Sequence, residues 1–372
     1  MYKLKASNTF IAFLLLLFGC SQVIDLDVDQ VGGELVVFGR ISNSTEGNFV
    51  KITRTQASGE LPLPVSGATV TLFDDQGNTE PLVERSPGEY TLSGNGLRKG
   101  TIGHQYHVEI NVDGQAYFTA PQQIPELLGK DSITWEQAVL EEISDTGTAT
   151  ETDVVNIFVE TEIDNLPEEF YFRWDLEEAY TFLGTFLPLN HFPLSGGQIQ
   201  CYVETDLNEQ NIFLHNGKTN RATFISPQLL VSRPVDLSFQ TLHYFNVIRS
   251  VINEETHEYW RRLDQIVNRQ GSIFDVAPAG VPGNVLSNND DGRVLGFFEV
   301  VAVDTTRLRM TRNDIPLFIF DPCEKVGQAF LELFTVPRDC RQCLVDEKII
   351  PEFCAYCRGL PGITYTRPSY FN

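Results

Sequence analysis

The fold class follows from residues 68–73, whose sequence is Ala-Thr-Val-Thr-Leu-Phe. Apolar and polar side chains alternate here, so Ala68, Val70 and Leu72 share one face of a strand while the threonines share the other. The acidic, glycine-containing residues 74–78 then favour a turn. The segment therefore predicts a β-strand with one buried face.

The same alternation recurs between residues 34 and 125. Tyr90 and Leu92 share a face of one predicted strand, and an Asp-Gly pair at residues 113–114 favours a hairpin turn after another. Short alternating strands separated by turn residues are typical of a sandwich of two sheets. We therefore expect an immunoglobulin-like β-sandwich over residues 34–125.

A second antiparallel β-rich domain is predicted over residues 130–322. Its expected strands include residues 131–135, residues 154–163 and the aromatic run 170–176, in which Phe, Trp and Leu alternate with Tyr, Arg and Asp. Residues 141–153 are polar and acidic, so they are expected to form a long loop. The fold class is mainly β.

One amphipathic helix is predicted over residues 254–270 of the second domain. Asn253 is a good N-cap, and Glu254 and Glu255 lie in the first turn, where the helix dipole favours negative charge. The apolar stripe of this helix comprises Tyr259, Trp260, Leu263, Ile266 and Val267. We expect the stripe to pack on the sheet of the second domain, with a partner-binding face as the alternative.

An export signal is predicted at residues 1–19. A short basic segment precedes an apolar run at residues 10–18, which is shorter than the roughly 20 residues that span a bilayer. Residues 17–20, Leu-Phe-Gly-Cys, fit the lipobox pattern, so Cys20 is the predicted lipid attachment site and mature N-terminus. The alternative is an ordinary signal peptide with a chance cysteine at its end.

The charge of the chain excludes some partners. The formal net charge is −23, which disfavours binding to nucleic acid or to anionic head groups. Membrane association must then come from acyl chains on Cys20, with residues 20–33 as a lipidated tether. The predicted location is the outer membrane, on either its periplasmic or its cell-surface face.

Six further cysteines are disulfide candidates, because an exported chain meets an oxidising environment. They are Cys201, Cys323, Cys340, Cys343, Cys354 and Cys357. Their pairing is left open. The last four could instead form a tetrahedral zinc site, but export favours disulfides, so no metal is predicted. Residues 323–372 are expected to form a cysteine-rich tail that packs on the second domain.

Motifs for catalysis are absent from the sequence, which holds no Gly-x-Ser-x-Gly, no His-Glu-x-x-His and no phosphate-binding loop. Acid pairs at residues 168–169, 177–178 and 254–255 could contain a glycosidase dyad, but neighbours in a strand point apart and most such acids are solvated. Residues 288–292 collect oxygen ligands without the spacing of an EF-hand. We expect no catalytic site and no cofactor.

Several segments together resemble one family. They are His257–Trp260, Gln270–Asp275, Gly283–Val285, Val294–Phe298, Cys354–Cys357 and Arg367–Phe371. The chain resembles a set of Bacteroidota outer-membrane lipoproteins that are classed as domain of unknown function 4249. The resemblance implies a role beside a TonB-dependent receptor, in uptake or in receptor assembly, and it implies no catalytic residue.

The expected function is therefore that of a non-enzymatic accessory or binding component, with the TonB-dependent receptor as its possible partner and with its ligand open. The alternatives are a surface adhesin or matrix-binding lipoprotein, and a carbohydrate-active enzyme. The aromatic residues 180–192 are a candidate contact surface, or else a buried pair of strands.

Overall fold

The computed structural model describes residues 33–56, 60–94, 96–143, 147–184, 199–208, 211–268, 281–288, 294–320 and 360–371, without the side chains of residues 183, 184 and 199. Within these ranges the chain is mainly β, with a single α-helix. The strands pair mostly in antiparallel fashion. The prediction of a mainly β fold is thus confirmed, while the immunoglobulin-like detail of the first sandwich stays a prediction.

The first sandwich begins with nine strands. They are β1 (Leu35–Ser42), β2 (Phe49–Arg54), β3 (Leu63–Pro64), β4 (Thr69–Asp74), β5 (Thr79–Ser86), β6 (Glu89–Leu92), β7 (Gln105–Val112), β8 (Gln115–Thr119) and β9 (Gln122–Gln123). Strand β4 shows the predicted alternation, because Val70 and Leu72 are buried and Thr69 is exposed. The apolar faces of these strands form the core of the sandwich.

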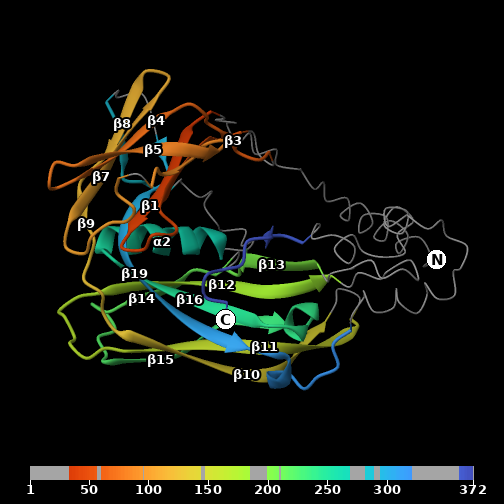
Figure 1. Cartoon of the computed structure of the whole chain (residues 1–372). Coiled ribbons are helices and arrows are strands. Elements are labelled where there is room, and N and C mark those ends of the chain that lie inside the picture. The colour runs from red at the N-terminus through yellow and green to blue at the C-terminus, as the bar shows by residue number, and fades with distance from the viewer. Residues whose placement is uncertain are drawn as a thin grey trace, which may run out of the picture.

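The second sandwich consists of two stacked sheets (Figure 1). One sheet holds β10 (Lys130–Ile143), β11 (Ala149–Glu162) and β15 (Phe224–Pro234). The other holds β12 (Tyr171–Gly184), β13 (Ile199–Asp206), β14 (Phe213–Asn216), β16 (His243–Ile252), β19 (Phe298–Met310) and β20 (Ile363–Thr364). Phe172 and Trp174 of β12 share one core with Ile157 of β11.

The long loop predicted at residues 141–153 is wrong. Strands β10 and β11 form one hairpin in which Glu141 pairs with Glu151, and strand pairing continues to Ile143. Polar composition favoured a loop, but Thr150 and Thr152 are β-branched, and β-branched residues suit a strand whose faces both meet water.

Strand β19 belongs to both sandwiches (Figure 1). Its first residues pair in parallel with β1, from Gly39 opposite Phe298 to Ser42 opposite Val301, and its later residues pair antiparallel with β16. Two further strands, β17 (Val285–Ser287) and β18 (Val294–Leu295), pair with β8 and β1. The sandwich predicted for residues 34–125 is therefore completed by strands from much later in the chain.

Helix α2 (Glu254–Val267) lies between the first sandwich and the larger sheet of the second (Figure 1). The predicted N-cap is confirmed, because the Asn253 side chain accepts a hydrogen bond of 2.8 Å from the backbone N–H of Thr256. Tyr259 and Trp260 of the stripe are partly buried and pack against Phe297 and Phe38, whereas Val267 at the other end is 47% exposed. The predicted stripe thus packs through its first turns, and its last turn meets solvent.

The C-terminal segment crosses the outer face of the larger sheet. Strand β20 pairs with β13, and the buried ring of Phe371 contacts Tyr202 and Tyr244. This segment therefore covers part of the sheet surface that faces the first sandwich (Figure 1).

A buried ion pair ties together the two sheets of the second sandwich. Arg249 of β16 donates to Asp131 of β10, and both side chains are fully buried. Asp131 also accepts a bond of 2.6 Å from the Thr161 hydroxyl, and Arg249 donates to the backbone oxygen of Gly129 at 2.9 Å. Removal of Asp131 would leave the buried Arg249 guanidinium with only the partly exposed Asp304, 3.4 Å away, as an ionic partner.

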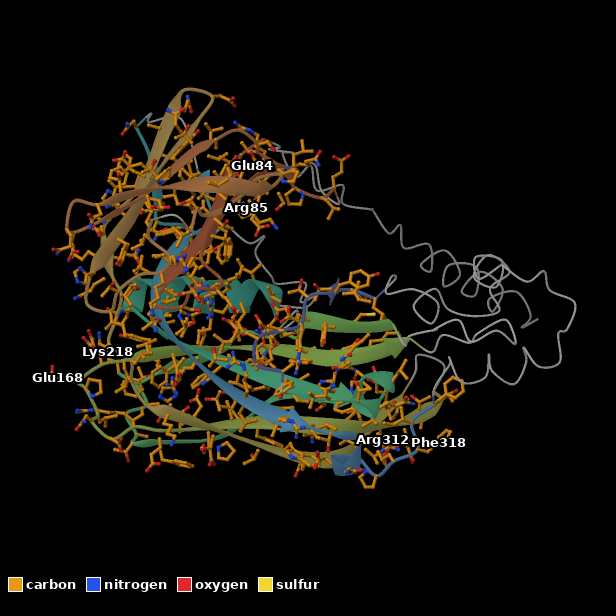
Figure 2. The ribbon with its side chains drawn as sticks, in the orientation of Figure 1. Glu84, Arg85, Glu168, Lys218, Arg312 and Phe318 are labelled. Atoms are coloured by element: carbon orange, nitrogen blue, oxygen red, sulfur yellow. The ribbon has the colours of Figure 1, made fainter. Side chains whose placement is uncertain are left out.

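Asp131→Ala should therefore lower the free energy of unfolding by about 3–5 kcal/mol, measured by urea denaturation. The matched control is Lys218→Ala, because Lys218 makes an exposed ion pair of 3.0 Å with Glu254 at the edge of the molecule (Figure 2). The control should unfold at the wild-type midpoint, since exposed pairs stabilise little. Equal midpoints for both variants would show that the Asp131 pair does not hold the sheets together.

Candidate functional site: a polar crevice between the sandwiches

A crevice of about 110 Å³ lies where the first sandwich meets the larger sheet of the second. One wall is the end of β1 and the loop that follows it, and the floor is the outer face of β12, β16 and β19. Tyr370 of the C-terminal segment also lines it. Polar and charged side chains dominate this lining.

The loop wall is held in shape by its own hydrogen bonds. The Asn48 amide oxygen accepts from the backbone N–H of Ser42 at 2.8 Å, and its amide nitrogen donates to the Ser44 oxygen at 2.6 Å. Asn43 bonds both backbone groups of Val303 on β19, at 2.6 and 3.1 Å. The wall is therefore fixed to the floor before any ligand arrives.

The floor follows from the alternation along β12. Phe172, Trp174 and Leu176 face the core, as predicted for the aromatic strand. Arg173 and Glu177 consequently face the opposite side, toward the first sandwich. Charged residues that alternate with large apolar ones thus put a row of charges on the crevice side.

The acid pair at residues 177–178 splits across the sheet, as expected for neighbours in a strand. Glu178 is not solvated, however, because it lies 4% exposed between the two sheets. Arg233 of β15 donates to both of its oxygens, at 2.8 and 3.2 Å, and Nε2 of His243 lies 3.2 Å away. Burial opposes ionisation, but these two partners lower the pKa of Glu178 below its ordinary value. Glu178 is thus a structural group.

A buried cluster of opposite charges borders the crevice. The Arg173 guanidinium donates to both oxygens of Glu299, at 2.8 and 3.1 Å, and to Asp175 at 2.9 Å. The Trp260 indole N–H donates to Glu299 at 3.0 Å, and its ring lies 4.2 Å from the guanidinium carbon of Arg173. Burial favours neutral Arg173, but Asp175 and Glu299 outweigh it and raise the pKa of Arg173.

The cluster reaches the crevice through Arg40 of β1. Its guanidinium lies 3.8 Å from Asp175 and donates to the Gly47 oxygen at 3.1 Å. Gly47 has a φ of +74°, and a Cβ at this position would lie 2.6 Å from Arg40. Glycine is thus needed for the loop to close over the arginine.

Glu177 stands in the crevice with no hydrogen bond from any described residue. Although part of its side chain is open to water, desolvation in the crevice raises the pKa of Glu177, and the neighbouring charge of Asp206 adds to the shift. The positive charge of Arg40 opposes this rise in pKa, and the negative charges of Asp175 and Glu204 add to it. Glu177 is therefore an exposed acceptor that no described residue bonds, surrounded mainly by like charges.

The far end of the crevice is built around Tyr370. Its hydroxyl accepts from the Asn246 amide nitrogen at 3.0 Å and donates to Glu204 at 3.2 Å. The guanidinium of Arg307 lies 4.4 Å from the ring centre. Burial raises the pKa of Tyr370 to about 12, with a further contribution from Glu204. The phenol therefore stays protonated and holds Asn246 in one orientation.

The predicted cysteine sites fall mostly outside the described residues. Cys20, the signal peptide at residues 1–19, Cys323, Cys340, Cys343, Cys354 and Cys357 lie there. Cys201 is described, fully buried on β13, and disulfide-bonded. The pairing of the other cysteines stays a prediction.

Two further predictions are only partly described. Of the aromatic residues 180–192, Tyr180 and Phe182 are buried in β12, and residues 185–192 lie outside the described ranges. Of the possible calcium turn at residues 288–292, only Asn288 is described. Among the residues that the structure describes, no three His, Cys, Asp or Glu side chains are placed to hold a metal ion.

The crevice residues were not predicted from the sequence. Arg173, between Phe172 and Trp174, carried a signal, because a charge flanked by buried aromatic residues needs a partner across the sheet. Its partner Glu299 lies 126 residues away, so the sequence alone cannot identify it.

Comparisons with known proteins identify a family but no activity. A family model described as "Domain of unknown function (DUF4249)" matches residues 22–307. Neither the curated proteins nor the solved structures contain a match. In the described part of the chain, no helix has the length and apolar character needed to cross a membrane.

Trp260→Ala should lower the free energy of unfolding by about 3 kcal/mol. This value is near the lower end of the range for loss of a large aromatic side chain, because Trp260 is only partly buried. The ring packs edge-on against Phe38 as well as over Arg173. Trp260→Phe is the matched control, since it keeps an aromatic ring while it loses the bond to Glu299, which contributes about 1–2 kcal/mol, and part of the ring packing. Chemical denaturation measures both. A wild-type midpoint for the alanine variant would instead favour an exposed, partner-binding stripe.

Glu177→Gln should raise the thermal midpoint at neutral pH. Because folding raises the pKa of Glu177, its contribution to stability is present below the unfolded value of about 4.5 and is lost as pH rises through the folded value. The midpoints of variant and wild type should therefore converge in acid. Asp113→Asn, an equal charge change at an exposed turn, is the control and should show no such pH dependence. A constant difference between Glu177→Gln and wild type at every pH would contradict the shift.

Proposed function

The chain belongs to the DUF4249 family of domains of unknown function, and we propose that it is an outer-membrane lipoprotein acting as a non-enzymatic binding component beside a TonB-dependent receptor. The observation that supports binding most directly is the crevice between the sandwiches. Its walls are fixed by internal hydrogen bonds, and it presents a buried acceptor, the Asn246 amide oxygen, that lacks a donor among the described residues. A preformed polar site suits recognition, because little ordering is needed when a partner arrives.

The charges around the crevice favour binding over chemistry. Arg173 and Arg40 are committed to neighbouring carboxylates, and Tyr370 is fixed between two hydrogen bonds. Among the groups that line the crevice and can meet a ligand are the carboxylates of Glu177 and Glu204, the Arg307 guanidinium and apolar side chains. These can recognise a partner by hydrogen bonding and charge.

The predicted anchor would hold this body close to a membrane. A short tether would join the lipid on Cys20 to the start of β1. Even fully extended, this tether would span only about 50 Å. The formal net charge of −23 disfavours direct contact with anionic head groups, so the acyl chains would supply the membrane affinity. A receptor in the same membrane would lie within reach of such a tethered body.

Cell fractionation with Cys20→Ala tests this function. The wild-type chain should sediment with outer membranes and, after detergent extraction, co-purify with a barrel receptor. The variant should be recovered as soluble material or be exported poorly, because it lacks the acyl chains. Ser21→Ala keeps the lipobox cysteine and is the matched control.

Two outcomes would overturn the proposal. Retention of the Cys20→Ala chain on membranes in high salt would show that lipid is not the anchor. Membrane attachment of the wild type without any co-purifying barrel protein would remove the receptor and leave the adhesin alternative.

A further inference from the structure

We propose that the crevice binds a protonated amine, an ammonium group on a short alkyl stem. The inference rests on the proposed binding function and names the chemistry of the ligand. It starts from two acceptors on adjacent strands of the crevice floor. The Glu177 carboxylate is exposed and accepts no hydrogen bond from a described residue, and the Asn246 amide oxygen is buried without a donor in the described part of the chain.

The two acceptors are direct neighbours. Glu177 of β12 and Asn246 of β16 are register partners in the sheet, and both line the crevice. Side chains of such a pair leave the sheet on the same face, with Cβ atoms roughly 5 Å apart. One small group can therefore contact both.

The orientation of Asn246 is set by Tyr370. The Tyr370 hydroxyl donates its hydrogen bond to Glu204, so its oxygen accepts from the amide nitrogen of Asn246. The amide oxygen is therefore the atom without a partner, although Asn246 is only 4% exposed. A buried polar atom without a hydrogen bond is costly, and a donor from a ligand would remove that cost.

Charge selects a cation for this place. Glu177 is faced by Asp206 and Glu204 from β13 and by Asp175 from its own strand, against Arg40 from β1. Arg40 is already engaged by Asp175, and Arg307 lies over the Tyr370 ring. A cation beside Glu177 would relieve the repulsion among these carboxylates, whereas an anion would increase it.

An ammonium matches the free groups better than the other candidates. It has donors and no acceptor, so it can satisfy a carboxylate and an amide oxygen together. A sugar hydroxyl has one donor, so it could satisfy only one of the two acceptors, and it would not relieve the charge. The described residues offer no set of three metal-ligating side chains, which disfavours a metal ion. Ile248 and Val303 also line the crevice and can contact an alkyl stem.

Isothermal titration of the soluble Cys20→Ala chain with n-butylammonium chloride tests the proposal, with n-butanol as the neutral probe of the same shape. The amine should bind and the alcohol should not. Glu177→Gln should weaken amine binding by roughly tenfold or more, because it removes the charged acceptor. Asp113→Asn makes the same charge change at an exposed turn and should bind like the parent chain. Thermal melts confirm that each variant is folded.

Two further readouts sharpen the test. Affinity for the amine should rise with pH as Glu177 ionises, and this dependence should vanish in Glu177→Gln. A short peptide with one lysine distinguishes the sources: tighter binding than butylammonium indicates a lysine side chain of a partner protein, and equal binding indicates a free amine.

The absence of amine binding at millimolar concentration, or equal weakening by Glu177→Gln and Asp113→Asn, would overturn the proposal. Neither result depends on membrane attachment or on a receptor. Failure of the amine site is thus separable from failure of the lipoprotein function.

Discussion

The structure depends on the bidentate pair between Arg173 and Glu299, buried beside the Trp260 indole. The three side chains come from the larger sheet, from the strand shared by both sandwiches, and from helix α2. A buried charge without its partner is strongly destabilising, so the three elements hold one relative position. The same cluster also fixes the position of the crevice wall, because Arg40 of that wall is joined to the cluster through Asp175.

Local patterns in the sequence predicted much of the fold. The alternation at residues 68–73, the aromatic strand at residues 170–176 and the N-cap at Asn253 each depend on neighbours a few residues away, and each is confirmed. The hairpin at residues 141–153 was missed, because its polar composition outweighed the strand preference of its threonines.

The crevice could not be predicted in the same way. It joins residues of β1 with residues of β12, β16, β19 and the C-terminal segment, and no short-range pattern records which of these meet. Glu177 appears in the sequence as half of an ordinary acid pair. Only the register of β12 against β16 shows that it lies beside Asn246.

The shared strand β19 also constrains how the chain folds. Strand β1 pairs with residues 298–301, so the first sandwich lacks its parallel neighbour until most of the polypeptide has been made. Contacts between residues so distant in sequence slow folding. The chain loses the conformational entropy of closing a long loop before the stabilising contacts can form. One edge of β1 meanwhile presents unpaired backbone groups, which invite wrong strand pairing. Newly made chains should therefore need protection by a chaperone from association with one another until β19 arrives.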